Sequence, residues 1–347
     1  MPGPVEIQDA LRIVDPQEMH LILLPTEQCN FRCTYCYEQF PVARMRPTVI
    51  RGVKALMARR AGALRFLELG WFGGEPLLAK PVVLDVSAYA QELARRNPGL
   101  VYAGSMTTNA YLLTEPVARE LVAVGVRSFH ISLDGPEDVH DQSRLRINGQ
   151  GSFRRIWTNL QAIADSDLEC SVILRIHYSP ETYLRLDPLI DQINDAFGDD
   201  TRFSVYFKDI ERLGGEGDDA IRLFSEDANH DIQAALNSKL RMTDRVYSEA
   251  RNGVYICYAS RANSLIVRHD GSLGKCTVAL YDERNTVGKI SEDGSLVIDH
   301  DRFRPWLVGL STLDPADLGC PYSSMNTGVK PDKDREDVRY LPIVATT

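Results

Sequence analysis

The sequence lacks the features that mark membrane and secreted proteins. No apolar run approaches the roughly 20 residues that span a bilayer, and Met1–Ile7 has neither the basic nor the apolar region of a signal peptide. The net charge of −9 leaves no basic excess with which to follow a phosphate backbone. Internal repeats and low-complexity tracts are also absent. We therefore expect a cytoplasmic protein with no membrane partner and no nucleic-acid partner.

Cysteine is scarce, at seven residues, and it is unevenly placed. Three cysteines lie within residues 29–36, whereas Cys170, Cys257, Cys276 and Cys320 are far apart. In a chain of 347 residues without a signal peptide, this odd, clustered set indicates metal ligation before disulfides. Cys170 lies in a strand-like stretch, and we expect it to be a core residue.

Strand-like and helix-like stretches alternate between about residues 20 and 208, which is typical of stacked βα units around a parallel sheet. The predicted strands are short and apolar, as strands buried on both faces are: Leu21–Leu24, Leu64–Trp71, Val101–Thr107, Ser128–Leu133, Ser171–Ile176 and Phe203–Phe207. Helical patterns fall near 47–61, 80–96, 115–124, 152–164 and 182–196. Six repeats are too few to close an eight-stranded barrel, so we predict an α/β fold with a partial, open (β/α)6 barrel.

Polar motifs follow the ends of successive predicted strands. The cysteine cluster comes after the first strand, Gly73–Pro76 follows the second, Thr107–Asn109 closes the third and Asp134 follows the fourth. The carboxyl ends of barrel strands meet at one face, and the loops there carry function. The sequence therefore predicts one composite site at that face.

The cysteine cluster reads C-x3-C-x2-C, with Cys29, Cys33 and Cys36 as its members. Three thiolates on one loop can ligate three irons of a cubic 4Fe–4S cluster and leave the fourth iron for a non-protein ligand. Tyr35 adds an aromatic face against which a flat adenine could pack. The alternative is a zinc site, but zinc usually takes four ligands and no fourth Cys or His lies nearby.

This spacing resembles the radical S-adenosylmethionine (radical SAM) family. The resemblance implies that the open iron chelates SAM and that an electron from the cluster cleaves SAM to a 5′-deoxyadenosyl radical. That radical then abstracts a hydrogen from the substrate. An external electron donor and a low-oxygen setting are implied as well.

Gly73-Gly74-Glu75 offers backbone N–H groups with no side chain in the way, followed by a carboxylate. In the family a similar segment binds the methionyl ammonium of SAM, which makes Gly73, Gly74 and Glu75 candidate cofactor contacts. The alternative is a plain turn between strand and helix.

The next two strand ends carry Thr107, Thr108, Asn109, Ser132 and Asp134. Their hydroxyl, amide and carboxylate groups suit ribose hydroxyls and the SAM carboxylate, and similar segments recur at these places in the family. The alternative for Asp134 is a local role, as the cap of a turn.

Residues 140–153 resemble the "HD..R…NG.GSF" stretch of peptide-modifying radical SAM enzymes. Arg144 is the candidate for the SAM carboxylate, a task that its rigid fork suits, and a surface role is the alternative. Ser152 is expected to cap the helix that follows it.

The later cysteines read C-x13-G-x4-C over residues 257–276, with Cys320 further on. This resembles the start of a SPASM/twitch extension, which holds auxiliary iron–sulfur clusters, but the remaining cysteines of a full SPASM domain are missing. The resemblance implies one auxiliary 4Fe–4S cluster on Cys257, Cys276 and Cys320, with an open or non-cysteine fourth site. The alternative is three ordinary buried thiols.

Asp209 and Glu211 follow the last predicted strand and are candidate acid or base residues, with a solvated charged loop as the alternative. We expect an N-terminal arm over 1–19, the barrel over 20–212, a linker and bridging helix over 213–256, a small α+β SPASM/twitch-like domain over 257–325 and a tail over 326–347. His269–Ser272 and Glu292–Ser295 are predicted hairpin turns.

Within the family, the resemblance favours maturases of ribosomally made precursor peptides, which form a ring, a C–C or thioether cross-link, or an inverted centre. About 19 residues precede the first predicted strand, too few for a winged-helix leader-recognition domain. We therefore expect leader recognition to come from a partner protein or from the barrel mouth. The alternative substrate is a small metabolite such as a sugar or nucleoside.

Overall fold

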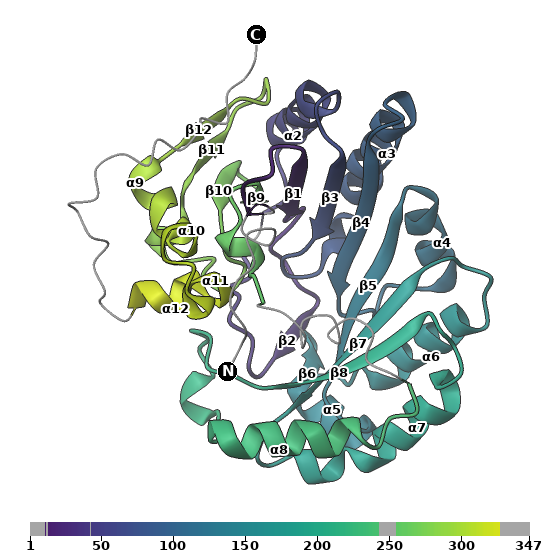
Figure 1. The fold of residues 1–347 in the computed structure, drawn as a ribbon. Helices are drawn as coiled ribbons and strands as arrows, with labels where there is room; N and C mark the ends of the chain where they lie inside the picture. The colour runs from purple at the N-terminus through teal and green to yellow at the C-terminus, as the bar shows by residue number, and fades with distance from the viewer. Residues whose placement is uncertain (1–10, 12, 42, 243–254, 327–347) are drawn as a thin grey trace.

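The computed structural model describes residues 11, 13–41, 43–242 and 255–326. Six parallel strands with intervening helices form the larger part of the molecule (Figure 1). The strands are β1 (Glu18–Leu23), β3 (Phe66–Trp71), β4 (Val101–Thr108), β5 (Val126–Leu133), β7 (Ser171–Tyr178) and β8 (Phe203–Asp209). They lie side by side in this order, each parallel to the next. All six predicted strands are confirmed, and the partial barrel with them.

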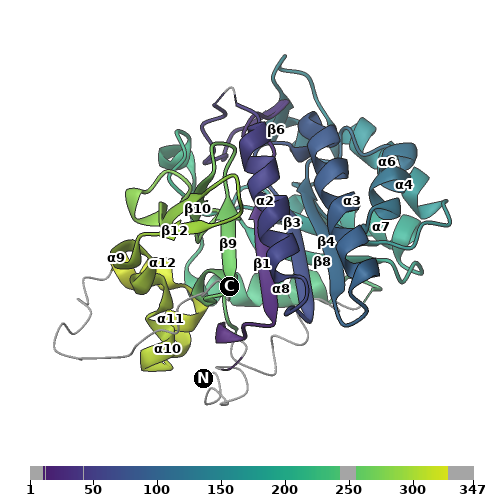
Figure 2. The same ribbon diagram turned by 90° about the horizontal axis from the view of Figure 1, so that it is seen from above.

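The crossover helices pack along the outer face of these strands (Figure 2). They are α2 (Pro47–Arg60), α3 (Lys80–Arg96), α4 (Glu115–Ala123), α5 (Glu137–Ser143), α6 (Phe153–Ala164) and α7 (Asp187–Phe197), with the 3-10 turns η1 (Pro76–Ala79) and η2 (Tyr183–Arg185). Proline stands in the first turn of α2, α3, α4 and α7, where its missing N–H leaves no hydrogen bond unmade. Proline in the first turn therefore helps to set where each of these helices begins.

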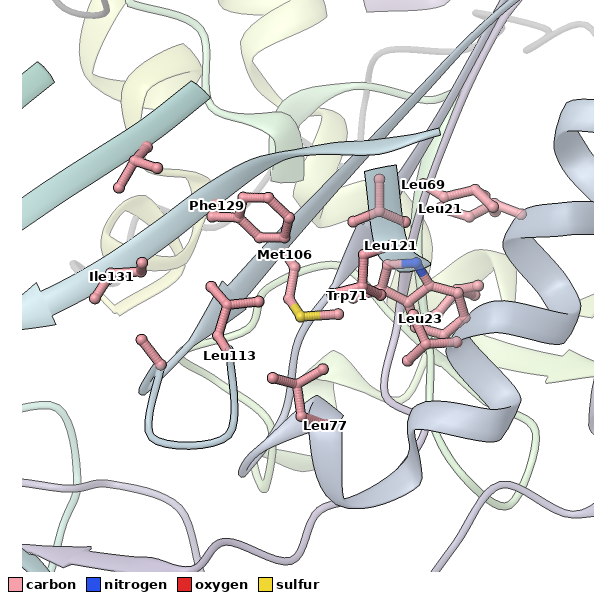
Figure 3. Close-up of a cluster of buried hydrophobic side chains, with 14 of the residues drawn as sticks. Leu21, Leu23, Leu69, Trp71, Leu77, Met106, Leu113, Leu121, Phe129 and Ile131 are labelled. Carbon is pink, nitrogen blue, oxygen red and sulfur yellow. The ribbon is translucent and has the colours of Figure 1, made fainter. Parts of the chain in front are cut away.

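The core lies between the strands and their helices (Figure 3). Trp71 on β3 is 1% exposed, and its indole N–H donates to Ser87 Oγ of α3 at 3.1 Å. Met106 and Phe129 from the next strands fill the same layer and are fully buried. Burial of each large apolar side chain contributes about 1.5–3 kcal/mol, so this layer fixes the strand ends on which the polar motifs sit. Cys170 is buried directly before β7, as expected.

The sheet does not stop at the barrel. β9 (Ser264–Val267) pairs parallel with β1, and β10 (Ser272–Gly274), β11 (Gly288–Ile290) and β12 (Leu296–Ile298) extend the sheet by antiparallel pairing. Both predicted hairpin turns are confirmed, and Gly271 and Gly294 adopt the positive φ that such turns need. Because β9 joins β1, the extension shares its sheet with the barrel, which the sequence did not predict.

The remaining helical elements are short, apart from α8. They are η3 (Asp218–Ala220), α8 (Glu226–Asn237), η5 (Tyr258–Ser260), η6 (Glu283–Asn285), α9 (His300–Phe303), η7 (Arg304–Leu307), α10 (Gly309–Thr312), α11 (Pro315–Gly319) and α12 (Pro321–Asn326). α8 is the expected bridging helix and packs against the edge strand β8. The predicted tail beyond 326, most of the N-terminal arm and part of the linker lie outside the described residues. Among the described helices, none combines the length and apolar character needed to cross a bilayer.

Candidate functional site

The cysteine loop leaves the carboxyl end of β1 and is held by a small separate sheet. β2 (Phe31–Cys33) pairs antiparallel with β6 (Arg144–Arg146), which places Cys33 opposite Arg144. Burial raises the pKa of the Cys33 thiol, and the Arg144 charge offsets part of that rise. Burial likewise raises the pKa of Cys36 to about 12. Bare thiolates are costly here, so binding of iron would be coupled to proton release.

A cavity of about 300 Å³ opens at the same end of the barrel. The predicted residues that line it are Cys29, Cys33, Cys36, Tyr35, Gly73, Gly74, Thr107, Thr108, Asn109, Ser132, Arg144, Asp209 and Glu211. Their convergence comes from six parallel strands ending at one face. Glu75 and Asp134 do not line the cavity.

Glu75 is fully buried, and both of its carboxylate oxygens are engaged by the protein. They accept hydrogen bonds from Leu77 N (3.0 Å), Thr108 Oγ1 (2.8 and 3.0 Å) and Asn109 N (2.8 Å). In this structure Glu75 therefore ties η1 to the end of β4 instead of facing a ligand. The sequence could not distinguish these roles, because both need a carboxylate after the glycine pair.

The glycine pair is required by close packing against the cysteine loop. Gly74 has a φ of +42°, and a Cβ there would lie 2.1 Å from the carbonyl oxygen of Gln28. Gly73, at φ +84°, would place a Cβ 2.6 Å from Leu24 Cγ. The backbone therefore turns here and also lines the cavity, and its contact with the SAM ammonium stays a prediction.

Asn109 connects the third strand end to the first cysteine. Its amide Nδ2 donates to Asn30 Oδ1 at 2.8 Å and lies 3.8 Å from Cys29 Sγ. The backbone N–H of Phe31 also donates to Cys29 Sγ, at 3.3 Å. Hydrogen bonds to a sulfur favour its thiolate form and tune any metal that it holds.

Asp134 is buried and anchors Tyr35. It accepts hydrogen bonds from Tyr35 OH (2.9 Å) and Ser143 Oγ (2.5 Å), and His177 Nδ1 lies 3.4 Å away. Burial alone would raise the pKa of Asp134, but the His177 contact and the Arg144 charge hold it well below its usual range. Asp134 thus fixes the aromatic ring beside Cys36, and its own oxygens are already engaged.

Arg144 is 7% exposed and reaches the cavity between Cys33 and Tyr35. Its Nη1 donates to Tyr35 OH at 2.9 Å, whereas its buried Nε has no hydrogen-bond partner among the described residues. A buried, unsatisfied N–H on a cation is costly unless an anion completes it. The donor set therefore fits a cubic cluster with the SAM carboxylate: three thiols on one loop beside an arginine with an unused donor.

Hydrogen bonds within the 140–153 stretch cap α6 and fix the backbone next to Arg144. Asp141 Oδ1 accepts from the backbone N–H groups of Ser152 (2.8 Å) and Phe153 (2.9 Å), so Asp141 caps α6. The prediction that Ser152 caps this helix is wrong, because its hydroxyl donates to Arg144 O at 2.7 Å. Gly151 leaves room for the Asp141 carboxylate. The stretch holds the backbone of Arg144 in place.

The three later cysteines converge in the extension. Burial raises the pKa of Cys257 to about 11, and the nearby thiols of Cys276 and Cys320 add to the rise. The backbone N–H of Cys257 donates to Leu318 O at 2.9 Å, which brings it close to Cys320. Lys275, 1% exposed, is buried beside Cys276 and donates to Ser264 O at 2.7 Å and to Arg261 O.

Within the described ranges, no three His, Cys, Asp or Glu side chains gather as they would around a single metal ion. A cubane cluster makes a different demand, since each thiolate binds a different iron.

Asp209 and Glu211 lie at the cavity rim beside Lys208, whose Nζ is 3.5 and 2.9 Å from them. Their charges are thus partly balanced within the rim.

The sequence analysis missed Glu38 as a cavity residue. Its Oε2 accepts from Gly74 N at 2.7 Å, and burial raises its pKa to about 7. Its position two residues after Cys36 was the available signal. Thr277 and Val278, next to Cys276, also line the cavity. One cavity therefore reaches from the first cysteine triad to the chain beside the second.

Residues 23–192 match the Radical SAM superfamily. Curated relatives include a GTP 3′,8-cyclase of Cyanothece sp., 35% identical over 143 residues (39% of this chain, 40% of the relative), and a cysteine-type anaerobic sulfatase-maturating enzyme of Clostridium novyi, 26% identical over 202 residues (50% and 52%). The alignments thus span about two fifths to half of these relatives. Residues 23–192 belong to the radical SAM superfamily.

Solved structures have the same fold. The anSMEcpe enzyme with bound AdoMet superposes with a TM-score of 0.60 at 18% identity, covering 84% of each chain. Streptococcus suis SuiB bound to S-adenosylmethionine gives 0.59 at 12% identity, covering 88% of this chain and 70% of SuiB. The matched segment, residues 23–192, falls in a superfamily whose chemistry implies a 4Fe–4S cluster with SAM.

Proposed function

We propose that this chain modifies a residue of a ribosomally synthesised precursor peptide, forming a ring, a C–C or thioether cross-link, or an inverted centre. When bound, the cluster and SAM supply a 5′-deoxyadenosyl radical for hydrogen abstraction. Cys29, Cys33 and Cys36 would hold the cluster, and Arg144 would hold the SAM carboxylate. Gly73, Gly74 and the polar end of β4 would line the cofactor, with Tyr35 beside the adenine.

The observation that carries this proposal is a cavity that reaches from the first triad to the chain beside the second. It is lined by Cys29, Cys33 and Cys36 at one end and by Thr277 and Val278, beside Cys276, at the other. A substrate side chain in this cavity would lie between the site of hydrogen abstraction and a site that could accept the product's electron. We propose that Cys257, Cys276 and Cys320 hold one auxiliary 4Fe–4S cluster, and that an external donor reduces the first cluster.

Two structural relatives support a peptide substrate. anSMEcpe has been solved with bound AdoMet and the Cp18Cys peptide, and SuiB with its precursor peptide SuiA. The sulfatase-maturating relatives point in the same direction, because sulfatases are proteins. In such a site the chain's own groups position one side chain of a long substrate, and the barrel mouth has to admit the rest of the peptide.

The second candidate is a small-molecule substrate of the nucleoside class. It is favoured by the curated GTP 3′,8-cyclases, among them one of Microcystis aeruginosa that is 27% identical over 282 residues. That alignment covers 72% of this chain and 78% of the relative.

One experiment separates the candidates. The anaerobically reconstituted enzyme is incubated with SAM and dithionite, and with either GTP or peptides from short reading frames next to its gene. We expect 5′-deoxyadenosine and a peptide mass change that both disappear in Cys33→Ala. Turnover of GTP with no change in any candidate peptide would refute the peptide proposal, and product from Cys33→Ala would refute radical SAM chemistry at this triad.

A further inference from the structure

A buried carboxylate stands immediately before the first cysteine triad. Glu27, two residues before Cys29, is 0% exposed. Its partners come from the extension: Arg268 Nε lies 3.0 Å from Oε1, Arg268 Nη2 lies 2.5 Å from Oε2, and His269 Nδ1 lies 2.6 Å from Oε1. Both oxygens are therefore held by residues about 240 positions away in the sequence.

Arg268 also grips the segment that follows Cys276. Its Nη1 donates to Leu280 O at 2.9 Å, and its guanidinium lies 5.1 Å from the centre of the Tyr281 ring. The Tyr281 hydroxyl in turn accepts the backbone N–H of Gln39 at 3.1 Å. Glu27 precedes Cys29 and Gln39 follows Cys36, so these contacts hold the cysteine loop on both sides.

The geometry favours a rigid link. A guanidinium that binds a carboxylate with two parallel N–H groups fixes orientation as well as distance. Loss of Arg268 would leave the buried Glu27 carboxylate with His269 as its remaining partner, and removal of one member of a buried ion pair is strongly unfavourable. The hydrogen bonds that Arg268 donates go to Glu27 beside the cysteine loop and to Leu280 in the segment after Cys276. None of these contacts reaches the cavity.

We propose that Arg268 is a positioning residue that holds the Cys29–Cys36 loop in cluster-binding shape by tying it to the Cys276 segment of the extension. The inference rests on the proposed cluster site at Cys29, Cys33 and Cys36, and it is independent of the substrate. It assigns the extension a role in assembling the first cluster in addition to the auxiliary site.

The test is Arg268→Met, which keeps the aliphatic packing and removes the fork. The full chain is reconstituted anaerobically, then challenged with an iron chelator. Iron retention is measured, along with the change that SAM causes in the EPR spectrum of the reduced enzyme. We expect about 10- to 100-fold faster loss of the SAM-responsive cluster, the range found when residues supporting metal ligands are removed. Arg268→Lys should recover part of the retention.

Arg284→Met is the matched control. Arg284 makes the same kinds of contact within the extension, with Nε and Nη2 on Asp282 and its guanidinium 5.2 Å from the Tyr322 ring, and these contacts do not involve the cysteine loop. It should retain the cluster like the parent enzyme. Equal loss in both variants, or retention in Arg268→Met, would overturn the proposal.

Two further variants separate failure of the Arg268 link from a folding defect and from failure of the cluster site. If circular dichroism shows that Arg268→Met does not fold, Glu27→Gln takes its place, because it preserves the shape of the side chain and removes the buried charge. Retention of the cluster in folded Glu27→Gln would then contradict the proposed link. Cys33→Ala should show no SAM-responsive signal at all. If it does show one, the proposed cluster site fails, and that failure is distinct from failure of the Arg268 link.

Discussion

The two cysteine triads consist of the same residue type but are assembled in opposite ways. Cys29, Cys33 and Cys36 lie within eight residues (29–36), whereas the second triad is spread over 64 residues (257–320). The first is shaped by a loop that returns to the barrel through β2 and β6, and the second exists only because three segments of the extension pack together. A short motif can thus be read from sequence, whereas a dispersed one depends on its fold.

Each triad also has a buried cation beside it. Arg144 lies opposite Cys33 with an unused donor, and Lys275 is adjacent to Cys276 with its donors on backbone carbonyls. The free donor at the first site suits binding of an added ligand, whereas Lys275, whose pKa burial lowers to about 7, directs its described hydrogen bonds to backbone carbonyls. This difference predicts that SAM binds at the first triad alone.

Replacing one cysteine of each triad in turn should have the largest effect on activity. Cys33→Ala should abolish 5′-deoxyadenosine formation, whereas Cys276→Ala should retain it and lose the modified product, because the second triad would act after hydrogen abstraction. Iron analysis should fall from about eight to about four per chain in either variant if each triad holds one cubane. Product formation by Cys276→Ala at the parental rate would show that the second triad has no part in the reaction.

Arg144→Met should weaken SAM binding by about 10- to 100-fold, since a charge-assisted contact in a buried site is lost. Equilibrium binding of SAM to the reconstituted enzyme measures this directly. Arg146→Met, on the same strand but bonded to Tyr111 and Gln150, is the control and should bind SAM normally. Lys275→Met should alter product formation and leave SAM affinity as it is; equal SAM affinity in Arg144→Met and the parent would remove Arg144 from the site.

The turn glycines of the two regions should differ in cost. Gly74→Ala places a Cβ 2.1 Å from a backbone carbonyl next to the cysteine loop, so we expect the free energy of unfolding to fall by about 3 kcal/mol. Gly271→Ala places its Cβ 3.1 Å from the Val49 side chain and 3.4 Å from the Ile290 carbonyl oxygen, a looser fit at a φ of +89°, and should cost about 1–2 kcal/mol. Gly62→Ala, with nothing within 4 Å, is the control. Urea titration of the three variants checks the order.

The smallest effect is a pH dependence centred on the barrel. Burial lowers the pKa of His140 and of His177 to about 4, whereas the unfolded chain takes up these protons near pH 6.5. Protonation of these two histidines therefore destabilises the native state as the pH falls from about 6.5 to 4, whereas Glu38, whose pKa burial raises to about 7, acts in the opposite direction and offsets part of the loss. Urea midpoints of the metal-free chain between pH 7 and pH 4 measure this. His140→Asn should flatten the slope; an unchanged slope would contradict the assignment.

Much of the site could be predicted because strand direction decides it. Parallel strands bring Thr107, Asn109 and Ser132 to one face whatever their exact packing, and the cavity lining confirms that convergence. Glu75 and Asp134 were placed at the correct strand ends, but whether a carboxylate there faces a ligand or satisfies buried N–H and O–H groups depends on neighbours that spacing does not specify.

By itself, the sequence determined the six βα repeats, the first cysteine triad and the face on which the site lies. These follow from local periodicity and from the fixed direction of parallel strands. Tertiary structure alone decided that β9 joins β1, that Arg268 reaches Glu27 and that Cys257, Cys276 and Cys320 meet. Such contacts join segments far apart in the chain, so they are set by the packing of the whole extension against the barrel.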